Sequence, residues 1–241
     1  MRLRLASVAG LLLAIGWASI AQSGQPSRTI LVLGNAAFIN DASVQQATGA
    51  VVSRDPGMPL QDVAVLVLAN TPFSSLPQPI QDGLVDYVGG GGGVLITGGA
   101  QSFGSGGYKA VSPIIPFQIR SDSDWRFISF RPPVPLQPGH PIISGVTFIT
   151  IGTVNDMNPR PGATEILQSP GGGSAGLRAG GGVTGGGSYL YPLIAEVGVG
   201  SGRVIGIAFD LNDFAGMRDR DLFLQNTLTY LLAASRAGLT R

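Results

Sequence analysis

The chain has 241 residues, of which 44% are hydrophobic and 12% are charged, so it can bury a large core and does not have the composition of a disordered protein. Its formal net charge is +1, and its basic residues are scattered, which argues against nucleic acid or an acidic membrane surface as a partner. It contains no cysteine and one histidine, which excludes disulfides, a lipid-modified cysteine and a thiol nucleophile.

Residues 1–23 have the pattern of a secretory signal peptide. Arg2 and Arg4 precede an apolar run over 5–20, and small residues then form possible cleavage sites at 19–21 or 21–23. A helix of this run would be about 24 Å long, shorter than the ~30 Å hydrocarbon core of a membrane, so we expect cleavage rather than a retained anchor. The mature protein is then expected in the periplasm or outside the cell, after a linker at 24–28. We expect the protein to contact the membrane only if residues 1–23 are not cleaved off.

Three buried strands alternate with two helices in the first part of the expected domain. The strands are expected at 29–33, 63–68 and 94–97, where short apolar runs show no polar alternation. A helix capped by Asp41 is expected over 41–52, and a second begins near Pro77 and ends at the glycine run 89–93. This alternation implies right-handed parallel crossovers. It predicts a flavodoxin-like, doubly wound α/β fold, with a mostly parallel sheet and helices on both faces.

Beyond residue 108 the strands become shorter and proline becomes more frequent. Further strands are expected at 117–120, 125–131, 163–167, 189–197 and 203–209. The last two form a late β-hairpin around the glycine-rich turn 198–202, and a closing helix follows over 219–235. We expect one α/β domain over 29–236, with a glycine-rich surface loop at 171–187 and a tail at 237–241.

The stretch 89–108 indicates a functional site, because it combines a turn, a buried strand and a second glycine loop. Ligands of α/β folds bind at the carboxyl ends of parallel strands, where glycine lets backbone N–H groups converge on an anion or a carbonyl oxygen. The alternative is that these glycines only shape a tight loop. The expected lining of a binding crevice is Gly98, Gly99, Gln101, Ser102, Gly104, Gly106, Gly107 and Tyr108. No dinucleotide or P-loop motif is present in the required context, and no cofactor is expected.

The segment 63–116 carries a family resemblance in its GGGVLITGG core and QSFGSGGY continuation. It resembles the glutamine amidotransferase-like domain of bacterial envelope proteins, which is related to the class I glutamine amidotransferase, DJ-1/PfpI and ThuA-like superfamily. Further similar pieces lie at 140–142, 161–163, 192–194, 198–203 and 223–231. The family's enzymes carry a cysteine on the turn after this strand, completed by a downstream histidine and glutamate. Here the turn at 97–99 has no thiol, so cysteine-dependent glutamine hydrolysis is excluded.

The resemblance implies an exported, non-catalytic domain that binds a small ligand or a protein partner in the cell envelope. Two enzymatic alternatives remain open: a ThuA-like sugar-related enzyme, and a serine hydrolase using Ser102, because Ala100 to Gly104 resembles a nucleophile elbow. His140 would then be the base, with Asp122 or Asp124 orienting it. The glycines after Ser102 start a helix poorly, however, and the resemblance implies a structural turn at His140. A self-assembling envelope protein that pairs through edge strands, and hence a homo-oligomer, is a third alternative.

Two other groups have competing interpretations. Asp210, Asn212 and Asp213 follow a strand end and form either a loop cap or a weak cation site; the absence of spaced calcium ligands favours the cap, and no metal is expected. Alternating aromatic residues at Trp125, Phe127 and Phe130 form either a core or interface face or a platform for stacking a sugar. The cations Lys109, Arg120, Arg126 and Arg203 are expected to be solvated or locally paired.

Overall fold

The computed structural model describes residues 28–148, 150–170, 190–213 and 218–235. The predicted signal peptide, most of the linker, the glycine-rich loop at 171–187 and the tail at 237–241 lie outside the described residues. Within those described ranges, no helix is both long and apolar enough to span a membrane.

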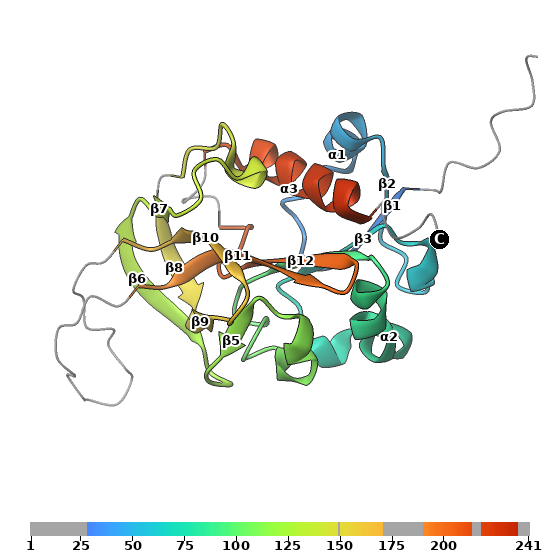
Figure 1. The fold of residues 1–241 in the computed structure, drawn as a ribbon, viewed down its shortest axis with the longest axis horizontal. Helices are drawn as coiled ribbons and strands as arrows, with labels where there is room; N and C mark the ends of the chain where they lie inside the picture. Colours follow the sequence, from blue (N-terminus) through green and yellow to red (C-terminus); the bar gives the residue numbers. More distant parts are fainter. Residues whose placement is uncertain (1–27, 149, 171–189, 214–217, 236–241) are drawn as a thin grey trace, which may run out of the picture.

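An eight-stranded sheet forms the centre of the molecule (Figure 1). Its spatial order is β2-β1-β3-β4-β12-β11-β10-β7. The strands are β1 (Thr29–Gly34), β2 (Val51–Ser53), β3 (Val65–Ala69), β4 (Gly93–Thr97), β7 (Val134–Pro135), β10 (Thr164–Gln168), β11 (Pro192–Val199) and β12 (Gly202–Ile207). The segment from β2 to β12 is parallel, and β11, β10 and β7 continue it as antiparallel neighbours. The predicted mostly parallel α/β sheet and its late hairpin are confirmed.

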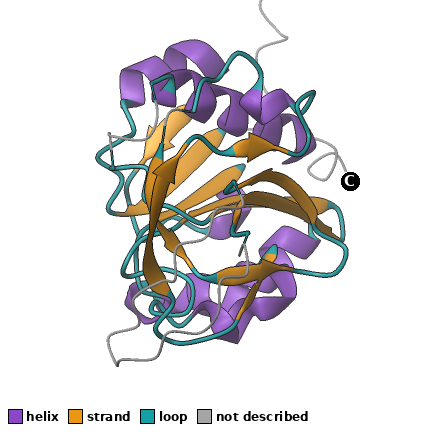
Figure 2. Ribbon diagram, turned by 90° about the vertical axis from the view of Figure 1, so that its left-hand side faces the viewer, coloured by secondary structure: helices purple, strands orange, loops and turns teal. Residues whose placement is uncertain are grey.

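Helices cover both faces of this sheet, as Figures 1 and 2 show. One face carries α1 (Asp41–Thr48) and α3 (Arg220–Ser235), and the short helix η4 (Pro141–Ile143) packs against α3. The other face carries α2 (Gln78–Gly89) with the short helices η1 (Leu60–Asp62), η2 (Phe73–Ser75) and η3 (Tyr108–Ile114). Alternate residues of the central strands point to opposite faces, so the buried apolar side chains form two separate cores.

Two small antiparallel ribbons flank the main sheet. β5 (Phe117–Ile119) pairs with β9 (Met157–Pro159), and β6 (Trp125–Arg131) pairs with β8 (Ile151–Asn155). β6 has the predicted bounds. Neither β8 nor β9 was predicted, because their sequence mixes glycine, asparagine and proline with few consecutive apolar residues, a composition typical of turns.

The prediction of a helix over 41–52 is wrong for the second half of this range. The helix ends at Thr48, because Gly49 adopts a left-handed conformation (φ 68°) that terminates the helix, and residues from Val51 onward form the edge strand β2 instead. The cap is also one residue earlier than predicted: the side chain of Asn40 accepts a hydrogen bond from Ser43 N (3.1 Å). Valines 51 and 52 favour the extended conformation that pairing with β1 provides.

Candidate functional site

The chain reverses its direction of progress across the sheet between β1 and β3. From β1 it proceeds to β2 on one side, whereas from β3 it proceeds to β4 on the other side. Such a reversal leaves a crevice beyond the carboxyl ends of the two strands, which is the usual ligand position in open α/β sheets. Asn35 follows β1 and Asn70 follows β3, so two amide side chains flank this point.

Asn70 is the centre of a hydrogen-bonded network at this edge. Its Nδ2 donates to Asp210 Oδ2 (2.8 Å), and its Oδ1 accepts from the backbone N–H of Gln101 (2.9 Å). Its φ of 36° is unusual for a residue other than glycine, although asparagine tolerates it best. Asn212 Nδ2 donates to Asn35 O (2.8 Å) and to Asp210 Oδ1 (2.9 Å). The side chains of Asn70, Asp210 and Asn212 thereby join the loops after β1, β3, β4 and β12, with the backbone of Asn35 and Gln101 as partners. The role of Asn70 was not predicted from the sequence.

The buried glycines 98 and 99 allow close packing at the end of β4. Gly99 N donates to Asn155 Oδ1 (3.0 Å), and Asn155 Nδ2 donates back to Gly99 O (3.2 Å). A Cβ on Gly98 would lie 2.5 Å from the carbonyl carbon of Ala208, so only glycine fits between β4 and the end of β12. The N–H of Gly99 is therefore held by the protein's own Asn155, on β8.

The rest of the glycine loop is filled by its own side chains. Ser102 and Tyr108 are completely buried, and the Phe103 ring packs between those of Tyr108 and Phe117. Burial also raises the pKa of Tyr108 far above its usual range. The buried carboxylate of Asp124 accepts hydrogen bonds from Gly104 N (3.0 Å) and from the N–H and hydroxyl of Ser105 (3.1 and 3.0 Å). Of the expected crevice lining, only Gln101 and Gly107 are exposed; Gly104 and Gly106 are buried as well.

The structure does not form the serine-hydrolase triad considered from the sequence. His140 lies against the Tyr230 ring of α3, at 5.1 Å between centroids, and its Nε2 is 3.5 Å from Glu196 Oε2 on β11. Its Nδ1 accepts from the backbone N–H two residues on, which confirms the structural turn. Neither acid orients it, because Asp124 holds the glycine loop and Asp122 pairs with Lys109 (2.8 Å). The buried Ser102 hydroxyl hydrogen-bonds to no described residue.

Replacing Ser102→Ala is therefore expected to keep the protein as stable as before or to stabilise it by about 1 kcal/mol. A buried hydroxyl that lacks a partner costs free energy, and alanine removes it without adding volume. Chemical denaturation of the two proteins measures the difference. A loss of more than about 1 kcal/mol would show that the hydroxyl makes a stabilising contact, and a loss of esterase activity would restore the hydrolase interpretation.

Asp210 forms a loop cap, as the sequence analysis favoured. Its Oδ1 accepts from the backbone N–H of Asn212 (2.8 Å), and its carbonyl accepts from Asp213 N (3.1 Å). These bonds tie the chain back on itself directly after β12. In the parts of the chain that the structure describes, no three histidine, aspartate or glutamate side chains gather at a spacing suited to a metal ion.

The aromatic strand β6 places one ring in solvent beside the sheet edge. Phe127 is 77% exposed, so the core interpretation is wrong for it, and the side chain of Phe130 lies outside the described residues. Phe127 stands directly opposite Thr153, and Trp125 stands opposite Asn155. Opposed residues of an antiparallel pair share a face. Thr153 and Asp210 also line the same small hollow, so β8, the strand that pairs with β6, lies beside the polar network.

The four cations have local partners, as expected. Arg120 pairs with Asp156 (3.2 Å), Arg126 donates to the carbonyl of Ser123 (2.6 Å), and Arg203 lies over the Tyr230 ring, 4.5 Å from its centroid. Lys109 pairs with Asp122. At the carboxyl edge of the sheet, Asp210 bonds to the amides of Asn70 and Asn212, and it shares a small hollow with the charged residues Asp213 and Arg220.

Solved structures show which known fold this arrangement shares, although the sequence matches no protein-family model and no curated protein. A cytoplasmic protein from Salmonella typhimurium is similar over 85% of this chain and 98% of its own, with a TM-score of 0.60 and 14% sequence identity. A ThuA-like protein from Bacteroides uniformis is similar over 90% and 95%, with a TM-score of 0.52 and 14% identity. A β-galactosidase from Rahnella is similar over 89% of this chain but 32% of its own, with a TM-score of 0.52 and 12% identity. The chain therefore has an α/β fold that ThuA-like proteins share.

Proposed function

We propose that this chain is an exported, non-catalytic binding module whose site is the polar carboxyl edge of the sheet. The observation that carries the proposal is the set of polar side chains from the loops after β3 and β12, which hydrogen-bond to one another and to the backbone after β1 at the topological switch point. Such bonds hold a binding surface in one conformation before a ligand arrives, which lowers the entropic cost of binding.

Within the described residues, the serine and histidine considered as a nucleophile and base do not form a catalytic pair, which supports a binding role over catalysis. The chain has no cysteine, and the serine at the expected position is inaccessible and separate from the histidine. The histidine itself is engaged with Glu196 and Tyr230 on the face of the sheet that α3 covers. A reaction by nucleophilic catalysis would need both groups at one accessible point.

The chemistry of this edge favours a hydroxyl-rich ligand such as an oligosaccharide. Amides both donate to and accept from hydroxyl groups, whereas a carboxylate only accepts. The residues that supply these groups here are Asn35, Asn70, Gln101, Asp210 and Asn212. The exposed Phe127 ring adds an apolar face, on which the C–H side of a sugar ring can pack. The similarity to a ThuA-like protein and to part of a β-galactosidase agrees with this class of ligand.

Export rests on the amino-terminal sequence pattern, since residues 1–27 are outside the described part of the chain. Its test is the amino-terminal sequence of the protein recovered from a native or bacterial host, which should begin close to residue 22 or 24. A protein that retains residues 1–23 in the cytoplasm would contradict export but would leave the binding site unaffected.

Substitution of Phe127→Ala is expected to weaken oligosaccharide binding roughly tenfold, which corresponds to about 1.4 kcal/mol. Isothermal titration calorimetry against oligosaccharides selected on a glycan array measures the change. The matched variant Phe127→Tyr keeps an aromatic face and should bind as the original protein does. If Phe127→Ala and Phe127→Tyr bind the oligosaccharide with equal affinity, the ring does not stack on the sugar.

Replacing Asn70→Gly should weaken the same binding by at least roughly tenfold while the protein stays folded. Glycine adopts the left-handed conformation without strain, so the change isolates the amide group. Asp210 and Gln101 N then lose their partner at the switch point. The absence of binding to any oligosaccharide on the array, or binding unaffected by both substitutions, would refute a carbohydrate site at this edge.

A further inference from the structure

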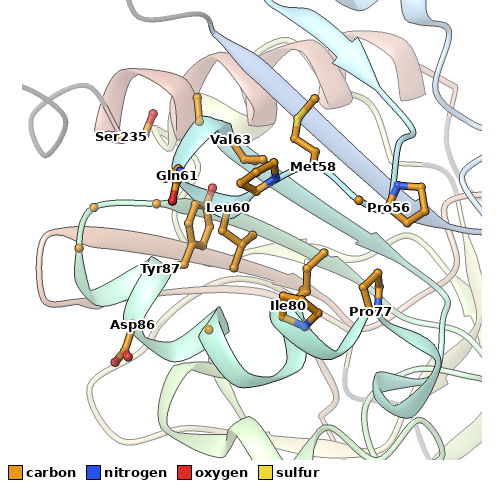
Figure 3. Close-up of a pocket in the computed structure, with 18 residues that line it drawn as sticks. Pro56, Met58, Leu60, Gln61, Val63, Pro77, Ile80, Asp86, Tyr87 and Ser235 are labelled. Atoms are coloured by element: carbon orange, nitrogen blue, oxygen red, sulfur yellow. The ribbon is translucent and has the colours of Figure 1, made fainter.

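A groove of about 680 Å³ opens at the other end of the sheet, at the amino ends of β3 and β4 (Figure 3). The loop between β2 and β3 forms one side, and α2 with the glycine turn that follows it forms the other. Its lining is mainly apolar: Figure 3 shows Met58, Leu60 and Ile80 with the ring of Tyr87. A cavity of this size holds a molecule of ordinary small-ligand dimensions.

Prolines and a tyrosine ring with fixed contacts restrict the walls of the groove. Prolines 56, 59, 77 and 79 line it, and each has a fixed φ. The hydroxyl of Tyr87 donates to Gly93 O (3.2 Å), and its ring packs where a Cβ of Gly92 would stand, so the ring is held by both partners. A ligand therefore meets a surface that is already formed, and ordering of side chains costs little on binding.

The electrostatics of the groove favour a positive charge. The helix α2 ends at the lining, where it is followed by Gly90. A helix carboxyl end carries a partial negative charge, and α2 has no basic residue in its last turn. The only charged side chain that lines the groove within the described residues is Asp86. The Tyr87 ring adds an electron-rich face that also attracts cations.

We propose that this groove binds a small molecule with an apolar body and one cationic head, such as a substituted ammonium group. The apolar side chains and prolines take the body, while the exposed carboxylate of Asp86 and the carboxyl end of α2 attract the head. This site is separate from the carboxyl edge, because it lies at the opposite ends of the same strands. The two sites can therefore be occupied independently.

Thioflavin T, a cationic and largely apolar dye, is the probe for this site, and the anionic dye 8-anilinonaphthalene-1-sulfonate is its counterpart. We expect thioflavin T to bind the full chain saturably with one site and the anionic dye to bind more weakly. Gly83 lies in the groove on α2, and an added Cβ would be in ordinary contact with Leu60 (3.4 Å). The variant Gly83→Phe fills the space and should weaken binding at least roughly tenfold.

Two further variants serve as controls. One tests whether Gly83→Phe acts by filling the groove, and the other tests whether the charge of Asp86 contributes to binding. Gly83→Ala adds only a methyl group at a helical position where alanine is favoured, so it should bind thioflavin T as the original protein does. Asp86→Asn keeps the shape of the side chain and should weaken thioflavin T roughly threefold, with no such loss for the neutral dye Nile red. Circular dichroism checks that Gly83→Phe is folded.

The proposal is overturned if thioflavin T fails to saturate, if Gly83→Phe binds it as Gly83→Ala does, or if the anionic dye binds more tightly. Leu239 is the large apolar residue of the tail at 237–241. Dye binding that appears only in Leu239→Ser would identify this tail as the occupant instead. A dimer that is lost only in Gly83→Phe, measured by sedimentation velocity, would identify a second copy. These outcomes do not depend on whether the carboxyl edge of the sheet binds oligosaccharides.

Discussion

Substitution of Gly98→Ala should lower the free energy of unfolding by roughly 3 kcal/mol. The new Cβ would lie 2.5 Å from the carbonyl carbon of Ala208 and 2.7 Å from the backbone nitrogen of Phe209. Backbone atoms of a central strand cannot move aside as the end of a flexible side chain can. Urea denaturation followed by tryptophan fluorescence and circular dichroism measures the change.

Gly139→Ala is the matched control for this experiment. No atom lies within 4 Å of the position of its Cβ, and its backbone is not in the left-handed region. Its stability should stay within about 0.5 kcal/mol of the original protein. An equally small effect of Gly98→Ala would show that the ends of β4 and β12 are not in close contact, and the role assigned to this glycine would then be wrong.

Replacing Asp124→Ala is expected to destabilise the protein by roughly 3 kcal/mol and to loosen the glycine loop. The completely buried carboxylate accepts hydrogen bonds from Gly104 N and from both the N–H and the hydroxyl of Ser105. Alanine would leave these donors without their acceptor, and hydrogen bonds to a charged acceptor are the stronger kind. Denaturation gives the free energy, and hydrogen exchange should show faster exchange of these two backbone amides.

The control for Asp124 is its neighbour Asp122, which also belongs to an ionic contact but an exposed one. Its carboxylate is 2.8 Å from the Lys109 ammonium group, and its side chain is 83% exposed. Water solvates both partners, so Asp122→Ala should cost less than about 1 kcal/mol. Similar costs for the two substitutions, or unchanged exchange of the loop amides in Asp124→Ala, would contradict the assigned role.

The central sheet was predictable because its signal is local. Strands buried on both faces appear as short apolar runs, and the residues that interrupt them are glycine, proline and asparagine. These patterns predicted β1, β3, β4, the late hairpin and α3 close to their observed positions. The error at residues 41–52 has a tertiary cause. The valines after Gly49 pair with β1, and this pairing is absent from the local pattern.

The sequence by itself determined that no cysteine chemistry is possible, that the fold is a mostly parallel α/β sheet, and that glycines follow its third predicted strand. Only the tertiary structure decided what those glycines do. Asn70, Asp124 and Asn155 come from distant parts of the chain to hold the loop, while Ser102 is buried and His140 turns to Glu196. A side chain's chemistry is readable from its type, but its partners and its access to water depend on contacts between segments far apart in sequence.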